Sequence, residues 1–183
     1  MLALSTAWNV QRHNRGKSLV EEIIDMGFSA IELSVEITED MLDEISTLYK
    51  KGKIKILCLH NFCPKLTRFP LGRSLLRAYL LSAIDREERK KAIELTKRTI
   101  DFAHLLNAEA VLIHAGEVNI ENRAKEIFAC WAKGEKARGE KLMSQVLNER
   151  EREKAVYLAN TLRSLEEISN YSERFNIKLG IEN

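Results

Sequence analysis

The strongest constraint on this chain is the alternation of short apolar segments with longer segments of helical periodicity. The apolar segments are residues 2–6, 30–34, 54–60, 111–114 and 177–181, and a helix-patterned segment separates each from the next. Because each helix must carry the chain back across the sheet, this order predicts parallel strands joined by right-handed crossovers. The fold class is therefore α/β, and the pattern leaves open either a doubly wound sheet or a barrel.

Three helix starts are predicted from capping residues. Ser18 with Glu21 three positions later has the form of a capping box, and Thr38 precedes the second helical pattern. Asp85 with Glu88 has the same form before the long third helix. These signals place the helices between the apolar segments.

A charged segment around residues 117–150 separates the fourth strand from the last helix. Apolar residues follow one helical face there until Gly134 and Gly139, which are expected to interrupt it, so we expect a helical insertion or lid. The rest of residues 1–183 is expected to form a single domain. The side chains that the last helix should turn inward are Leu158, Leu162, Leu165 and Phe175.

Composition excludes several classes of protein. The 183 residues are 45% hydrophobic and 31% charged, which suits one globular core. Lys and Arg number 29 against 27 Asp and Glu, so the chain lacks a basic surface that would bind nucleic acid. No segment approaches the roughly 20 apolar residues of a membrane span. We expect a cytoplasmic protein with no membrane partner. The charge balance does not support a nucleic-acid partner but leaves one open, and a homo-oligomer also stays open.

The glycine and cysteine patterns exclude two common sites. No glycine-rich phosphate loop follows the first strand, which argues against a dinucleotide site. Cys58, Cys63 and Cys130 are too few for a disulfide framework, which favours a reducing compartment. Cys58 and Cys63 also lack the spacing of a zinc ribbon, so we interpret the cysteines as small buried hydrophobic residues.

Four strands end on a side chain that can bind a metal or move a proton: Glu32, His60, His114 and Glu182. In parallel α/β folds, functional sites form at this carboxyl edge of the sheet. One such histidine is as well explained by a hydrogen-bonded rim position, but two histidines and a glutamate together suit zinc, manganese or iron. Glu182 could also serve as a proton-transfer base, and Glu32 could equally pair with a nearby Lys or Arg.

The strand segments carry a family resemblance. AIELS at the second strand, LCLHNF at the third, AVLIHAGEV at the fourth and LGIEN at the fifth resemble the xylose isomerase-like barrel superfamily. That group contains sugar and sugar-phosphate isomerases and epimerases, and the endonuclease IV type of DNA-repair enzyme. The resemblance extends over nearly the whole chain and implies a parallel (β/α) barrel of the TIM type.

The resemblance also implies roles for the four residues. Glu182 matches the glutamate of the fifth strand, which ligates the catalytic metal and in the epimerases moves a proton. His60 and His114 match histidines that line the substrate pocket or, in the endonuclease, bind an additional zinc. Glu32 matches an acidic position at the mouth, where it would bind substrate. The implied cofactor is a divalent ion, with Mn, Zn, Mg, Co and Fe all open.

The chain departs from the family pattern in its extent. Such barrels have eight strands and about 250 residues, whereas the sequence ends at a fifth strand, so we expect a partial barrel whose remaining metal ligands are absent. The leading hypothesis is an incomplete metal-dependent isomerase or epimerase of a small sugar, sugar phosphate or polyol. The alternatives are a zinc phosphodiesterase of the endonuclease IV type and a non-catalytic partial barrel, so enzymatic activity stays open.

Overall fold

The computed structural model describes residues 2–182 and contains a parallel sheet of five strands. The strands are β1 (Leu4–Ser5), β2 (Ala30–Leu33), β3 (Lys55–His60), β4 (Ala110–His114) and β5 (Lys178–Glu182). They lie in the sheet in their sequence order, and each adjacent pair is parallel. The predicted parallel α/β class is confirmed.

Helices connect the strands. They are α1 (Gly16–Asp25), α2 (Glu39–Lys50), α3 (Arg86–Leu105), α4 (Ala124–Ala132) and α5 (Lys136–Glu173), with short 3₁₀ turns at Thr6–Trp8, Val10–Arg12 and Leu75–Arg77. Within residues 2–182, no helix combines the length and the apolar character needed to cross a bilayer.

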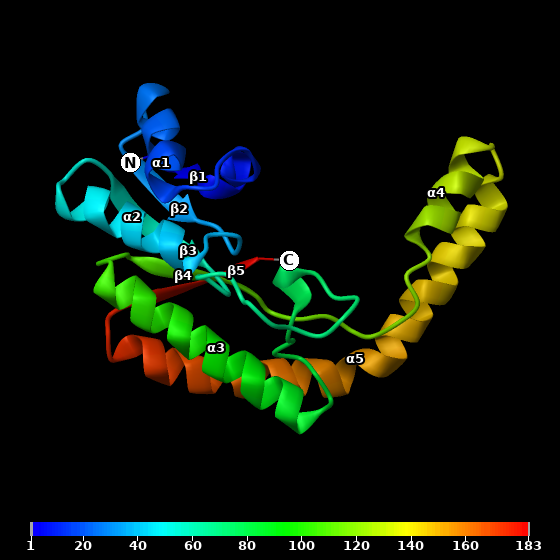
Figure 1. Ribbon diagram of the computed structural model, residues 1–183. Helices are drawn as coiled ribbons and strands as arrows, with labels where there is room; N and C mark the ends of the chain where they lie inside the picture. The colour runs from blue at the N-terminus through cyan, green and yellow to red at the C-terminus, as the bar shows by residue number, and fades with distance from the viewer. Residues whose placement is uncertain (1, 183) are drawn as a thin grey trace.

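The strand order decides between the two architectures that the sequence left open. A doubly wound sheet reverses its strand order at a switch point, whereas the order here runs from β1 to β5 without reversal. Every crossover therefore turns the same way. The helices α1, α2 and α3 and the second half of α5 form an arc along one face of the curved sheet, as Figure 1 shows. This arrangement is a partial barrel.

The hydrophobic core lies between the sheet and this arc of helices. Its fully buried side chains come from every layer: Leu19, Val20 and Ile23 of α1, Ile31 and Leu33 of β2, Ile45 of α2, Leu59 of β3, Ile100 of α3, Ile113 of β4 and Ile168 of α5. Apolar burial of this extent is the main stabilising contribution to such a layered fold. The core fixes the strand ends that carry the polar residues.

Two of the three predicted helix caps are confirmed. The Thr38 hydroxyl accepts a hydrogen bond from the Met41 backbone N–H, and the Asp85 carboxylate accepts one from the Glu88 N–H. The prediction at Ser18 was wrong, because α1 begins two residues earlier, at Gly16. Gly16 packs directly against α2, where an added Cβ atom would collide with the Met41 carbonyl oxygen.

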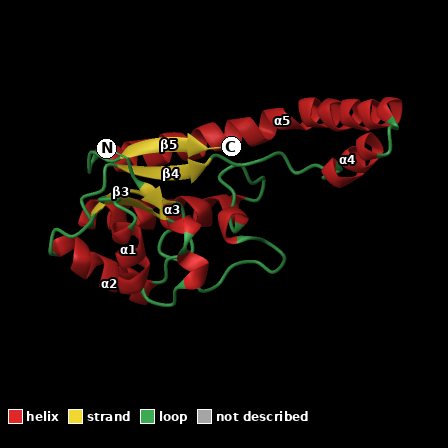
Figure 2. Ribbon diagram, turned by 90° about the horizontal axis from the view of Figure 1, so that it is seen from above, coloured by secondary structure: helices red, strands yellow, loops and turns green. Residues whose placement is uncertain are grey.

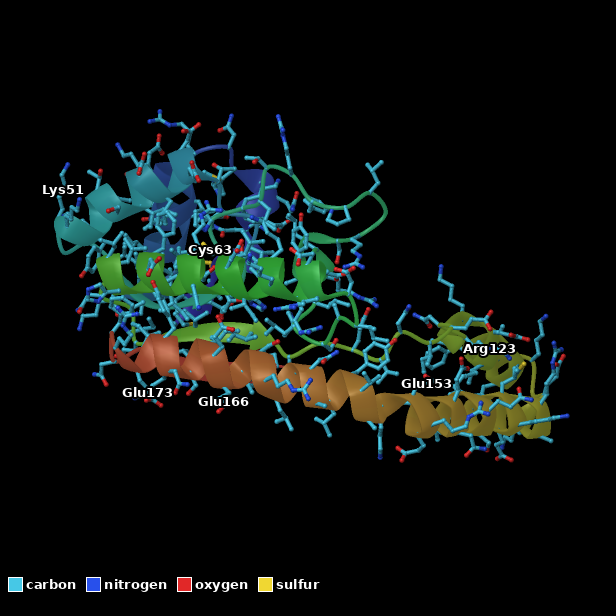
Figure 3. All side chains as sticks on the ribbon, turned by 90° about the horizontal axis from the view of Figure 1, so that it is seen from below. Lys51, Cys63, Arg123, Glu153, Glu166 and Glu173 are labelled. Atoms are coloured by element: carbon cyan, nitrogen blue, oxygen red, sulfur yellow. The ribbon has the colours of Figure 1, made fainter. Side chains whose placement is uncertain are left out.

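An arm formed by α4 and the first half of α5 projects from the sheet, in the segment where an insertion was expected (Figures 1 and 2). Gly134, with a φ of 77°, ends α4 as predicted, but Gly139 does not interrupt the helix. Gly139 is buried against Trp131, whose Nε1 atom would lie 2.5 Å from an added Cβ. Figure 3 shows Arg123 and Glu153 on this arm.

The inward face of α5 differs from the expected one. Leu158 and Leu162 are 55% and 58% exposed, so the prediction that they point inward was wrong, while Leu165 is partly buried against the core. The buried residues of this part of α5 are Asn160, Thr161, Ser164, Ile168 and Ser172. All of these except Ile168 are polar, and their side chains donate hydrogen bonds to backbone carbonyls. Asn160 donates to the Ala83 oxygen, and Ser164 donates to the Leu81 oxygen.

Candidate metal centre

Strand register brings the predicted residues to one edge of the sheet. His114 of β4 pairs directly with Glu182 of β5, and Ser5 of β1 pairs with Glu32 of β2. His60 is the last residue of β3, which lies between β2 and β4. Side chains from the ends of four neighbouring strands therefore meet at the carboxyl edge of the sheet. In Figure 1, the C label marks the end of β5 at this edge.

His60, His114 and Glu182 form a compact cluster. Their nearest donor atoms all lie within 4.8 Å of one another. The Nε2 atoms of His60 and His114 are 3.0 Å apart, and a carboxylate oxygen of Glu182 lies 3.8 Å from the His60 Nε2. The three residues predicted as metal ligands are thus brought together, with both rings presenting the same nitrogen.

Glu32 lies on the other side of His60. Its Oε1 atom accepts a hydrogen bond from the Ser5 hydroxyl at 3.1 Å and lies 3.4 Å from the Nδ1 of His60. The sequence left open a pairing of Glu32 with a Lys or Arg, but its partner here is the His60 ring. Glu32 therefore contacts the Nδ1 side of the His60 ring, opposite the Nε2 atom that faces His114.

The surroundings shift the pKa values of two groups in the site. Hydrogen bonding to His60 is the main cause that lowers the pKa of Glu32, with a further contribution from Ser5, so this carboxyl stays ionised. Burial, followed by the neighbouring His60, lowers the pKa of His114. A neutral imidazole is the form that can bind a metal, and the lowered pKa favours this form of His114.

The cluster fits a divalent cation. Two imidazole nitrogens and a carboxylate oxygen are donors that zinc, manganese and iron accept. Ligand nitrogens about 2.1 Å from a shared ion stand roughly 3 Å apart when they are at right angles to each other, and the two Nε2 atoms are 3.0 Å apart. Without a cation between them, the two Nε2 atoms can form a hydrogen bond only if one of them bears a proton and the other does not.

Sequence reasoning missed three contributors to the site. Ser5 hydrogen-bonds to the Glu32 carboxylate, and Cys58 pairs with Glu32 across the neighbouring strand. Period-two alternation along their strands would have placed them on the same inner face. Burial, with a smaller effect of Glu32, raises the pKa of Cys58 to about 12, so its thiol stays protonated. Gly180 leaves room for Leu112, whose Cδ2 would lie 2.6 Å from an added Cβ.

The loop that follows His114 is fixed by a serine. The Ser82 hydroxyl donates to the Glu117 carbonyl oxygen at 2.9 Å and accepts from the Glu117 N–H at 3.0 Å. Gly116, the residue before Glu117, has a φ of 124° and packs against Ser82. A Cβ atom at this position would lie 2.5 Å from the Ser82 hydroxyl oxygen. Both features hold the backbone directly after β4 against the loop that precedes α3.

Several solved structures share this fold. A D-tagatose 3-epimerase-like protein superimposes with a TM-score of 0.61 at 19% identity, over 99% of this chain and 52% of its own. D-psicose 3-epimerase from Clostridium cellulolyticum H10, solved with D-tagatose, gives 0.58 at 12% identity, over 97% and 50%. L-ribulose 3-epimerase gives 0.57 at 12% identity, over 99% and 49%. The chain thus spans about half the length of these structures.

The sequence itself identifies the family. No curated protein sequence matches the chain significantly. The family model of the xylose isomerase-like TIM barrel matches residues 20–183, which include all four residues predicted from the strand ends. With the parallel partial barrel and the sugar epimerase folds that it resembles, this match shows that the chain belongs to the xylose isomerase-like TIM barrel family.

Proposed function

We propose that this chain carries part of the active site of a metal-dependent isomerase or epimerase that acts on a small carbohydrate. His60, His114 and Glu182 would hold the divalent cation. The observation that carries the proposal is the convergence of these three side chains within 4.8 Å at the carboxyl edge of the sheet. Three of the similar structures bear the names of ketose 3-epimerases or a protein like them, which supports a carbohydrate substrate.

The chemistry of the proposed site follows from its residues. When bound, the cation would polarise a substrate carbonyl and hold a neighbouring hydroxyl. Glu182, whose side chain is 49% exposed, can reach a substrate above the strand ends and would take the proton from the carbon beside that carbonyl. His60 and His114 are more enclosed and would hold their positions during proton transfer.

Metal binding is the first test. Purified chain stripped of metal is titrated calorimetrically with Zn²⁺ and then with Mn²⁺, and we expect one ion per chain. His114→Ala and Glu182→Ala should each abolish binding. His104→Ala is the matched control, because this histidine lies in the last turn of α3, packs on Phe175 and is outside the cluster. Equal binding by all four proteins would refute the proposed site.

Catalysis is tested by proton exchange. Incubation of the metal-loaded protein with ketohexoses in D₂O should place deuterium on the carbon next to the carbonyl, which proton NMR detects. Glu182→Gln should abolish this exchange while His104→Ala retains it. Metal binding without any exchange across a panel of ketoses would leave a metal site but contradict the proposed proton transfer by Glu182 in this part of the active site.

The endonuclease IV type of zinc phosphodiesterase is a second candidate. The feature that favours it is the convergence of His60 and His114 through their Nε2 atoms, because in that enzyme type the equivalent histidines would bind zinc. A net charge of +2 gives little attraction for DNA. Cleavage of a duplex with one abasic site, lost in His60→Ala, would favour this candidate over the isomerase.

A further inference from the structure

Glu32 is bound in a way that suggests a role in the site other than substrate binding. Its carboxylate accepts the Ser5 hydroxyl at 3.1 Å and faces the His60 Nδ1 at 3.4 Å, and Glu32 pairs across the strands with Cys58. The contacts with Ser5 and His60 both involve Oε1, so this oxygen faces the neighbouring strands β1 and β3.

The contact with Glu32 determines which nitrogen of His60 bears the proton. A neutral imidazole has one N–H donor and one bare nitrogen, and an ionised carboxylate can only accept. Facing Glu32, Nδ1 of His60 must therefore carry the proton, and Nε2 is left with a free lone pair. This is the arrangement of histidine ligands whose second nitrogen is bound by a carboxylate.

The His114 contact agrees with this assignment. The two Nε2 atoms are 3.0 Å apart, so one of them must donate to the other when no cation lies between them. If the Nε2 of His60 is bare, the donor is the Nε2–H of His114. A divalent cation would have to displace the Nε2 proton of His114, whereas the Nε2 of His60 would already be unprotonated.

The sheet keeps Glu32 in place. Ser5, Glu32 and Cys58 occupy paired positions on β1, β2 and β3, so the three groups are held by the backbone ladder rather than by a loop. The Glu32 side chain is 20% exposed, which restricts competition from water. A rigid set of supporting contacts of this kind preorganises a metal ligand.

We propose that Glu32, held by the Ser5 hydroxyl, is a positioning residue that fixes His60 in its Nδ1–H tautomer and so leaves Nε2 free for a divalent cation. The inference rests on the proposed metal site, because an unprotonated His60 Nε2 has a function only if it binds a cation. It assigns Glu32 to orientation of a ligand in place of the substrate contact that the family resemblance implied.

The test reads the tautomer directly. Nitrogen NMR of ¹⁵N-histidine-labelled, metal-free protein is recorded in mildly alkaline buffer, where imidazoles are neutral. The wild-type His60 should show a protonated Nδ1 and an unprotonated Nε2. In Glu32→Ala the pattern should move toward the Nε2–H form that free imidazole side chains prefer. Glu36→Ala, which removes a nearby carboxylate bonded to Gln11, should leave the His60 signals unchanged.

Zinc affinity is measured on the same proteins. Loss of a supporting carboxylate typically costs about 10- to 100-fold in metal affinity, and we expect a loss in this range for Glu32→Ala, a smaller one for Glu32→Gln and none for Glu36→Ala. Circular dichroism checks folding, and Glu32→Gln takes the place of Glu32→Ala if the alanine variant does not fold.

The outcomes separate the inference from the proposed function. If wild-type protein binds no zinc, the metal site is refuted, whatever the tautomer. If wild-type protein binds zinc but the His60 signals are the same with and without Glu32, the positioning role is refuted and the metal site stands. A changed tautomer with unchanged zinc affinity would also overturn the inference, because the fixed proton would then have no effect on binding.

Discussion

The Nε2 atoms of His60 and His114 lie 3.0 Å apart, although the two residues are 54 positions apart in the chain. Their rings are 5.0 Å apart between centroids and tilted by 34°, so the nitrogens point toward a common region without stacking of the rings. Two cationic imidazoles at this distance would repel each other, and the lowered pKa of His114 reflects both its burial and this repulsion. The pair therefore behaves as one unit.

This pairing predicts that the effects of His60→Ala and His114→Ala on zinc affinity are strongly non-additive. Each single variant should lose more than the roughly 100-fold that removal of a supporting residue can cost. The double variant should be little worse than either, because the first substitution already removes the chelate. Calorimetric titration of the three variants provides the measurement. Small losses that add up in the double variant would show that the histidines do not share an ion.

Gly139 predicts the behaviour of the projecting arm. Alanine is normally favoured over glycine in a helix by about 1 kcal/mol, but a Cβ at this position would come within 2.5 Å of the Trp131 indole nitrogen. Overpacking of this kind costs about 1 to 3 kcal/mol, so Gly139→Ala should lower the midpoint of thermal unfolding. In a Trp131→Ala background the same substitution should become neutral or stabilising. A stabilising effect in the wild-type background would contradict the packing of Trp131 on α5.

Glu22 predicts a pH dependence of stability at a distance from the metal site. Hydrogen bonds from His13, then Asn9 and Arg12, lower the pKa of this carboxyl from 4.5 to about 2. A lowered folded-state pKa means that the ionised carboxylate stabilises the fold fully above pH 4.5, and that this contribution disappears as the pH falls toward 2.

Glu22→Gln should therefore destabilise the protein at neutral pH, and the difference from wild type should shrink as the pH falls toward 2. Urea unfolding over a pH series measures this difference. Glu21→Gln, which removes the neighbouring exposed carboxylate and its 3.7 Å contact with Lys17, is the control. A Glu22→Gln penalty that stays constant across the pH series would show that the His13 network does not favour the ionised form.

Much of the fold could be predicted because apolar runs and capping residues act locally. The strand segments and the caps Thr38 and Asp85 follow from short sequence patterns, and the strand ends at His60 and His114 follow from the same runs. Glu32 was found as a polar strand end, but its contact with Ser5 depends on the register of β1 against β2. No local pattern specifies that register. The contacts that join Ser5 to Glu32 and Glu32 to His60 could therefore be found only in the three-dimensional structure.

The errors have a common physical cause. Ser18 resembles a cap, but α1 begins earlier, at Gly16, which packs directly against α2. Gly139 resembles a helix break, but it provides space for Trp131. In both cases tertiary packing overrides a local preference of the chain, and the partner residue lies on another helix.

The face of α5 gives the last prediction. Leucines at helical spacing would normally mark the buried side, yet Leu162 is 58% exposed while Ile168 is fully buried. Leu162→Lys should therefore change the free energy of unfolding by no more than about 0.5 kcal/mol, whereas Ile168→Ala should cost about 2 to 5 kcal/mol. Chemical denaturation of both variants provides the comparison, with light scattering to follow the oligomeric state. A large loss in Leu162→Lys, or a change in its molar mass, would show that this face of α5 is covered in solution.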